Sequence, residues 1–233
     1  MADQESWAAR AWDQRYRNGN LYKGHEAIPF VKNDVAPAIR SLSASFDFES
    51  FSCLEIGIGN GRNIRPLMSA GLSRLVGLDI SGVALEQLQK KPIADSHTQL
   101  ELRQGDLSVL SLEEKFAAVL AIHVFQHGTR DEGLANIDQA KQHVAGGGLL
   151  ALCVEAVVNK PKFEDGLAFE VFDDGSYTIY PNDGGGPIHA FSRPELDIAL
   201  SGFNVVQSLR YVTSIFPKPV GIAARWEGIW RLE

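Results

Sequence analysis

The sequence has no long hydrophobic run and few cysteines. No stretch reaches the roughly 18 apolar residues that a membrane-spanning helix requires. The opening residues, MADQESWAAR, lack the positive region and apolar stretch of a secretory signal, so we expect a cytoplasmic protein. The two cysteines, Cys53 and Cys153, both lie in apolar stretches. They are therefore expected to be buried core thiols with no disulfide or metal role.

Positive charge is also scarce. Lysine and arginine number 22 against 29 aspartates and glutamates, which gives a formal net charge of -7. Such a charge repels polyphosphate, and no basic cluster alternates with aromatic residues as in single-strand binding proteins. We therefore expect a small-molecule partner and neither a nucleic acid nor a membrane.

The pattern of apolar runs predicts an α/β fold. A hydrophobic content of 45% is enough for a buried core. Short runs rich in β-branched residues alternate with helical patterns, which predicts a doubly wound, mostly parallel sheet with helices on both faces. The predicted strands are 51–56, 74–80, 100–104, 116–125 and 149–155, the predicted helices are 62–70, 83–90 and 131–143, and a closing hairpin of 203–215 and 222–232 makes the sheet seven-stranded with an antiparallel final strand.

Two segments depart from this rhythm. Residues 1–50 show two helical patterns, which predict an N-terminal helical cap ahead of a main domain at 51–233. Residues 156–190 interrupt the main domain, with a turn at 173–176, and we expect them to form an insertion over the active-site rim. A helix is expected after them, because Ser192 and Glu195 have the spacing of a capping box.

The most informative motif is Leu54-Glu55-Ile56-Gly57-Ile58-Gly59-Asn60-Gly61-Arg62-Asn63, where a predicted strand ends in alternating glycines and a helix follows. Glycines allow a turn this tight and let a ligand approach the strand end. A dinucleotide-binding fingerprint would place its third glycine one position later, where Arg62 stands. By itself the motif could also be a structural turn.

Two acidic residues follow the glycine motif, each at the end of a predicted strand. Asp79 ends the second predicted strand about 20 residues after the glycines, as expected of a group that accepts hydrogen bonds from ribose hydroxyls. Asp106 ends the third predicted strand. The alternative reading of Asp79 is an acid that caps the following helix.

With these three elements the sequence resembles the class I S-adenosylmethionine (SAM)-dependent methyltransferases, which implies a Rossmann-like fold. The resemblance covers residues 51–155 and extends through 191–203. It implies that Asp79 meets the ribose and that Asp106 and the amide of Leu107 meet the adenine. The cofactor-binding residues that it implies are Glu55, Gly57, Gly59, Gly61, Asn63, Asp79, Ile80, Asp106, Leu107 and His123.

Within that family, residues 59–63 together with Trp12 and Tyr16 look most similar to the branch of thiopurine and tellurite-resistance methyltransferases. Glu55 and Ile58 stand where members of that branch often have aspartate and cysteine. This departure weakens the assignment to the branch more than the assignment of the cofactor.

Several polar and aromatic residues are candidates for the acceptor side. His123 and His127 leave the fourth predicted strand and could act as proton acceptors, or could make structural hydrogen bonds. Trp12, Tyr16 and Tyr22 could form a lid over cofactor and substrate, although Trp12 and Tyr16 could equally dock the N-terminal helix. Five aromatic residues of the insertion could wall the acceptor pocket or form its local core, namely Phe163, Phe169, Phe172, Tyr177 and Tyr180.

The function expected from these observations is SAM-dependent methylation of a small molecule by direct in-line displacement. Positioning alone lowers such a barrier by roughly 7–11 kcal/mol, which fits the absence of an evident catalytic triad. We expect a soft acceptor atom such as sulfur or a heavier chalcogen, with oxygen or nitrogen as the alternative that would require a histidine base. The rival functions are a non-catalytic SAM sensor and a nicotinamide-dependent oxidoreductase.

Overall fold

The computed structural model describes residues 7–19, 26–93, 97–158, 167–182, 186–215 and 222–233. The chain divides into two compact units, Met1–Leu120 and Ala121–Glu233. No helix in the described ranges is long and apolar enough to cross a bilayer. The strands of the main sheet are β1 (Ser52–Ile56), β2 (Arg74–Asp79), β3 (Gln99–Gln104), β4 (Phe116–Ile122), β5 (Val144–Glu155), β9 (Asn204–Ile215) and β10 (Ile222–Arg231).

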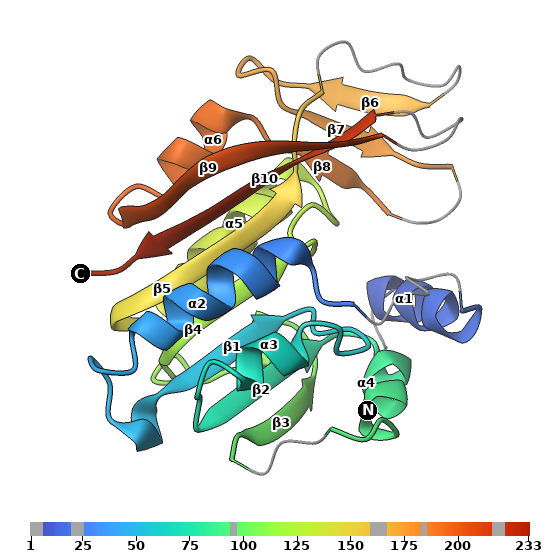
Figure 1. Ribbon diagram of the computed structural model, residues 1–233. Helices are drawn as coiled ribbons and strands as arrows, with labels where there is room; N and C mark the ends of the chain where they lie inside the picture. The colour runs from blue at the N-terminus through green and yellow to red at the C-terminus, as the bar shows by residue number, and fades with distance from the viewer. Residues whose placement is uncertain (1–6, 20–25, 94–96, 159–166, 183–185, 216–221) are drawn as a thin grey trace. The chain divides into compact units, whose positions relative to one another are not determined.

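The main sheet has seven strands in the order β3-β2-β1-β4-β5-β10-β9 (Figure 1). β1 pairs in parallel with β2, and β2 with β3, whereas β10 runs antiparallel to both β5 and β9. The α/β sheet expected from the sequence, with its antiparallel final strand, is therefore confirmed. Cys53 and Cys153 lie buried on β1 and β5, as expected.

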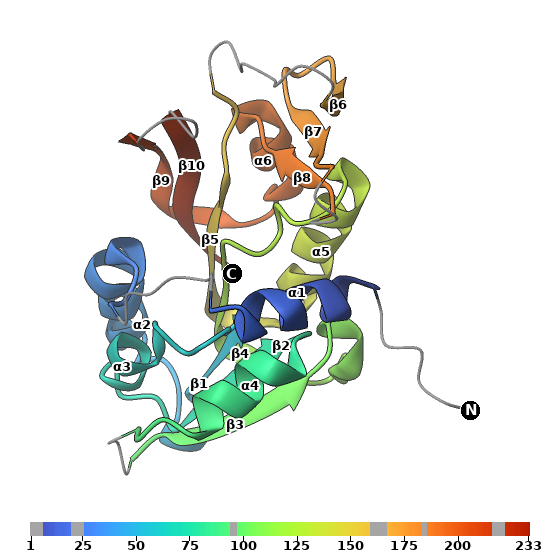
Figure 2. The same cartoon turned by 90° about the vertical axis from the view of Figure 1, so that its right-hand side faces the viewer.

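The first unit surrounds β1, whose residues are all buried. Its N-terminal part holds α1 (Trp7–Arg17), the π-helical turn η1 (Val31–Val35), α2 (Ala36–Ser41) and the short η2 (Phe48–Ser50). The helical patterns expected in this part are confirmed. After β1 come α3 (Ile64–Met68), α4 (Gly82–Gln89) and η3 (Leu107–Val109), and α1 packs against α4 (Figure 2).

Three predicted boundaries were wrong. β5 begins at Val144 and not at 149. The other two differ for local reasons. β4 ends at Ile122 and not at 125, because His123 takes a left-handed backbone with φ 59° that ends the extended strand. The helix expected at 62–70 spans only Ile64–Met68. It starts late because Gly61, with φ 79°, is still part of the turn.

The second unit holds α5 (Arg130–Gln142), α6 (Arg193–Ala199) and a small second sheet. α6 begins with the predicted capping box of Ser192 and Glu195. The second sheet consists of β6 (Ala168–Val171), β7 (Tyr177–Tyr180) and β8 (Ile188–Ala190), in that order. The predicted turn at 173–176 joins β6 to β7, with Gly175 at φ 82°.

Candidate active site

The glycine loop after β1 is held against the end of β2. The amides of Gly57 and Ile58 both donate to the carbonyl of Leu78, at 2.7 and 3.0 Å. Gly59 and Gly61 have φ values of 55° and 79°, which side chains on L residues rarely adopt. A Cβ on Gly59 would stand 2.5 Å from the hydroxyl of Tyr16. The backbone therefore requires glycine here, and a Cβ on Gly59 would in addition displace the Tyr16 hydroxyl.

Asp79 fastens this loop. Its Oδ2 accepts from the amide of Gly59 at 2.8 Å, and its Oδ1 accepts from the amide of Ser81 at 2.9 Å. Burial raises the pKa of Asp79, the two backbone hydrogen bonds oppose that shift, and nearby Asp13 adds to it. Each carboxylate oxygen can accept a further hydrogen bond. The predicted ribose ligand is thus aligned with the glycine loop before any ligand binds.

Glu55 lies beneath the loop and is 1% exposed. Its Oε1 accepts from Nδ2 of Asn63 at 2.8 Å, and Oδ1 of Asn63 accepts from the amide of Ile28 at 3.1 Å. Its Oε2 is buried without a hydrogen-bond partner in the described part of the chain. Burial raises the pKa of Glu55 to about 7, opposed chiefly by the hydrogen bond from Asn63. The carboxyl group therefore changes charge near neutral pH.

Asp106 and Leu107 lie at the end of β3, as predicted. The amide of Gly105 donates to the carbonyl of Asp79 at 2.9 Å, which joins the ends of β2 and β3. Oδ1 of Asp106 accepts from the amide of Ser108 at 2.9 Å and so caps η3. Asp106 is exposed and Leu107 is buried, whereas Ile80 is half-buried. The structure brings the predicted residues of all three strand ends into one hydrogen-bonded system within the first unit.

Asp13 is a residue of this system that the sequence reasoning missed. It is 5% exposed, and its Oδ1 accepts from the hydroxyl of Ser81 at 2.6 Å and from the amide of Val83 at 3.2 Å. It thus joins α1 to the turn that follows Asp79. The available signal was its position four residues after Ala9, which places an acid on the buried face of an amphipathic helix.

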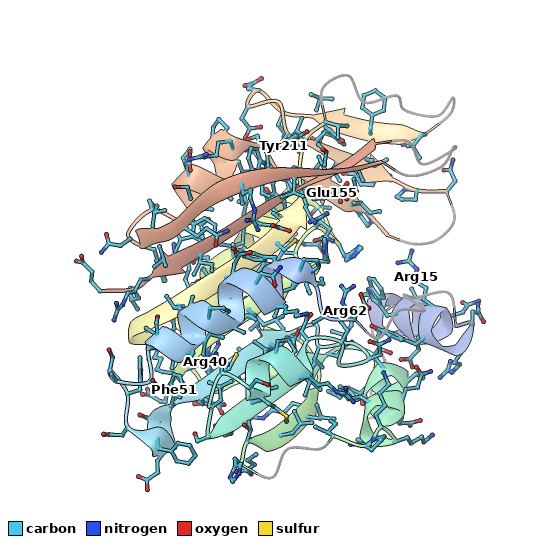
Figure 3. The ribbon with its side chains drawn as sticks, viewed as in Figure 1. Arg15, Arg40, Phe51, Arg62, Glu155 and Tyr211 are labelled. Carbon is cyan, nitrogen blue, oxygen red and sulfur yellow. The ribbon has the colours of Figure 1, made fainter. Side chains whose placement is uncertain are left out.

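The backbone of Tyr16 links α1 to α4. Its carbonyl accepts from the side chain of Gln87 at 3.2 Å, and its ring lies 6.5 Å from that of Trp12. Figure 3 shows Arg15 on α1 and Arg62 on the glycine loop, and the guanidinium of Arg15 lies 4.9 Å from the Trp12 ring. A lid role for Trp12 and Tyr16 stays a prediction. Tyr22 lies outside the described residues.

In the second unit, His123 adopts the strained conformation that ends β4. It is the one non-glycine residue with positive φ in the described ranges. Its amide donates to the carbonyl of Cys153 at 2.7 Å, and its Nε2 lies 3.4 Å from the Cys153 sulfur. Such a conformation costs about 1–3 kcal/mol and is concentrated at functional sites. This strain supports a functional role for His123, which stays a prediction.

His127 lies four residues further along the chain. Its amide donates to the carbonyl of Val124 at 2.9 Å, and it forms an isolated β-bridge with Ile188 next to the second sheet. His127 is half-buried. Its place as a proton acceptor stays a prediction, like its role in structural hydrogen bonds.

A buried polar network holds the insertion in place. The ring nitrogens of His189 are hydrogen-bonded to Thr178 and to Glu195, each at 3.0 Å. Glu195 also accepts a hydrogen bond from Arg130 at 2.6 Å. The guanidinium of Arg130 lies 4.5 Å from the ring of Phe172. Phe172 and the buried Tyr177 thus belong to a local core of the insertion, whereas Phe169 is exposed, Tyr180 is half-buried and Phe163 lies outside the described residues.

Part of the chain is similar to a known family of domains. A search of curated proteins finds no match to this sequence. Residues 53–148 match the family described as methyltransferase domain, and this range contains the glycine loop, Asp79 and Asp106. This part of the chain is therefore similar to a methyltransferase domain.

Solved structures of methyltransferases share this fold. The 1,6-didemethyltoxoflavin N1-methyltransferase of Burkholderia thailandensis is 16% identical, with a TM-score of 0.60 over 100% of this chain and 91% of that one. TehB of Haemophilus influenzae is 15% identical, with a TM-score of 0.61 over 96% and 67%. The N-methyltransferase NodS of Bradyrhizobium japonicum is 15% identical, with a TM-score of 0.60 over 97% and 99%. The first and the third of these contain S-adenosylhomocysteine.

Proposed function

We propose that this protein binds SAM and transfers its methyl group to a small molecule in the cytoplasm. The observation that carries the proposal is the bond from the Gly59 amide to Asp79 at 2.8 Å, which aligns the glycine loop of β1 with the acid that ends β2. In an open α/β sheet, ligands bind outside the carboxyl ends of the strands. The methyltransferase neighbours crystallised with S-adenosylhomocysteine support the same cofactor.

The residues of the first unit fit SAM. Asp79 retains lone pairs for the two ribose hydroxyls, and Ile80 borders it. Asp106 and the amide of Leu107 offer an acceptor and a donor to the adenine. A buried carboxylate oxygen needs a donor, and the ammonium of the methionine part would supply one to the unpartnered Oε2 of Glu55. The product would be S-adenosylhomocysteine.

The work of the protein in this reaction is positioning. SAM supplies an electrophilic methyl group on a sulfonium, which an acceptor lone pair attacks in line. Holding both reactants in that arrangement accounts for roughly 7–11 kcal/mol of the barrier. The loop residues Gly57, Gly59 and Gly61 fix one reactant, and Asn63 holds Glu55 in place through its 2.8 Å hydrogen bond.

The proposal also assigns a role to each segment of the chain, as expected from the sequence. Residues 1–50 form a helical cap, 51–233 form the methyltransferase domain, and the insertion at 156–190 selects the acceptor. Loops that follow parallel strands form ligand crevices, and long loops commonly serve as lids. The net charge of -7 favours a small molecule over a nucleic acid.

The test is cofactor titration followed by product identification. Asp79→Ala removes a charged hydrogen-bond acceptor from a desolvated site, a loss of about 1–3 kcal/mol that raises the Kd for SAM roughly 5- to 150-fold. Asp138→Ala changes a carboxylate that is 71% exposed and should leave the Kd unchanged. Methyl transfer from labelled SAM into a metabolite extract, with the product identified by mass, separates an enzyme from a sensor. Equal SAM affinity in a folded Asp79→Ala protein would refute the assigned site.

A further inference from the structure

Glu55 is a buried carboxyl group with one oxygen satisfied and the other not. It lies on β1 beneath the glycine loop and is 1% exposed. Its Oε1 accepts a hydrogen bond from Asn63 at 2.8 Å, whereas its Oε2 is buried without a hydrogen-bond partner in the described ranges. A buried carboxylate oxygen without a donor is costly, and a carboxyl group avoids that cost by taking up a proton. The protein without a ligand therefore favours the neutral acid of Glu55.

Asn63 does not supply the missing donor. Asn63 is 3% exposed, and its Oδ1 accepts from the amide of Ile28 at 3.1 Å. This bond fixes the orientation of the side-chain amide, so that its NH2 group faces Glu55 and donates to Oε1. Because the amide is held at both ends, a donor for Oε2 has to come from outside this pair.

The charges around Glu55 do not fully compensate its burial. Burial raises its pKa to about 7, the hydrogen bond from Asn63 and the positive charge of Arg62 lower it, and the negative charge of Asp79 on β2 raises it. Arg62 follows the glycine loop and is labelled in Figure 3. Cys53 on β1 also interacts with Glu55, and the pKa of that thiol is raised by burial and then by the carboxylate. Glu55 therefore exchanges its proton near neutral pH.

Asp79, the second buried acid of this cluster, differs in its hydrogen bonds. Its Oδ2 accepts from the amide of Gly59 and its Oδ1 accepts from the amide of Ser81. Burial raises its pKa, these two bonds lower it, and the charge of Asp13 on α1 raises it. Both oxygens of Asp79 thus have a donor before a ligand binds, and the ribose hydroxyls proposed to meet it bring no charge. A cationic ligand group is needed only at Glu55.

The amino-acid part of SAM carries such a cation. An ammonium has three N–H donors and a positive charge, so it can supply the hydrogen bond that Oε2 lacks and stabilise the ionised carboxylate. We propose that this ammonium replaces the proton of Glu55, so that the protein binds adenosyl amino acids with release of one proton. The inference rests on the proposed methyltransferase function and adds a regulation of its cofactor site by pH.

The exchange involves one proton and no redox step. The O–H bond of the Glu55 acid breaks, its electron pair stays on the carboxylate oxygen, and the proton passes to a buffer base in solution. The ammonium keeps its three hydrogens and donates one hydrogen bond to Oε2. The buried negative charge is thus formed only together with its countercharge, which avoids the cost of an isolated buried carboxylate.

Affinity for SAM should therefore depend on pH in a defined way. Below about pH 7 the free protein holds the proton and the complex does not, so a rise of one pH unit should increase affinity about tenfold. Above that value the affinity should stay constant until the α-amino group itself loses its proton, at about 7.7–8.0. A nucleoside that lacks the amino-acid part should show neither change.

The experiment is a calorimetric titration of the full chain at pH 6 and pH 7 in two buffers whose heats of ionisation differ, because the difference in binding heat counts the protons released. The ligands are SAM, S-adenosylhomocysteine and 5′-methylthioadenosine, which has the nucleoside and the thioether but no ammonium. SAM and S-adenosylhomocysteine should release about 0.9 proton at pH 6 and about half a proton at pH 7. 5′-Methylthioadenosine should release none from Glu55, so it reports any contribution from Asp79.

Three variants locate the proton. Glu55→Gln keeps an acceptor for Asn63 but cannot ionise, so its proton release should vanish and its affinity for SAM should not change between pH 6 and pH 7. Asn63→Ala removes a hydrogen bond that lowers the pKa of Glu55, so the affinity should level off at a higher pH than in the wild type. Glu86→Gln changes an exposed glutamate of α4, and this matched control should behave as the wild type does.

Three results would overturn the inference. The first is SAM binding by the wild type without proton release at pH 6, and the second is proton release that persists in Glu55→Gln. The third is equal release by SAM and 5′-methylthioadenosine, which would assign the proton to Asp79. If Glu55→Gln does not fold, the comparison of these two ligands on the wild type still decides. A wild type that does not bind SAM at all would refute the proposed function itself, which distinguishes the two failures.

Discussion

Replacing Glu55 with glutamine should change how stability depends on pH. The carboxyl group is 1% exposed, and burial raises its pKa from 4.5 to about 7. The folded protein therefore favours the protonated form, and the stability present below pH 4.5 is lost as pH rises to about 7. One pKa unit corresponds to about 1.4 kcal/mol, so ionisation of Glu55 costs the folded state about 3 kcal/mol.

Glu55→Gln does not ionise and retains an oxygen to accept from Asn63. Its free energy of unfolding should therefore rise relative to the wild type between pH 4.5 and 7, by about 3 kcal/mol, and stay constant above that range. Any loss from the added amide N–H groups shifts the whole difference curve without altering its slope. Proteins of this size change their Tm by about 2–4 °C per kcal/mol, so thermal melts in the absence of SAM resolve the effect.

Glu114→Gln is the matched control with the opposite sign. Its hydrogen bond from Arg103 lowers the pKa of Glu114 below 4.5. The wild type should therefore gain stability relative to this variant as pH rises toward 4.5, with no further divergence above that value. Stability curves of the wild type and Glu55→Gln that run parallel from pH 4 to 8 would refute our account of the buried carboxyl group.

The remaining predictions concern the loop, α1 and the strained histidine. Gly59→Val should abolish SAM binding in calorimetry, because the valine side chain would collide with Tyr16. Gly71 has φ 89° and open space around it, so Gly71→Val should lower only the Tm. Normal SAM binding by Gly59→Val would show that the loop has only a structural role. Asp13→Ala removes the acceptor of Ser81 and Val83 and should cost about 1–3 kcal/mol of stability, with weaker SAM binding, and an unchanged urea midpoint would contradict it. His123→Gly should relieve about 1–3 kcal/mol of strain while lowering transfer, and a variant no more stable than His123→Ala would show that the φ of 59° stores none.

Local signals in the chain were sufficient for much of the fold. The alternation of apolar runs and helical patterns identified the strands of the main sheet, because burial on both faces requires near-continuous apolar strands. The capping box at Ser192 was also predictable, since it depends on residues close together in sequence. Glycine spacing and the order of the acids pointed to similarity with methyltransferase domains for the same reason.

Only the tertiary structure could decide which polar groups are satisfied. Asp13 accepts a hydrogen bond from Ser81, which lies 68 positions away in the sequence. His189 on β8 is hydrogen-bonded to Glu195 on α6. Glu227 and Glu155 stand two pairs apart on paired strands. Among the described residues, Glu227 accepts hydrogen bonds from Arg225 and Arg210, whereas Glu155 accepts none from an arginine. These outcomes depend on the packing of distant segments. The sequence determined where the loops at the strand ends begin, and the folded structure decided which carboxyl groups are hydrogen-bonded.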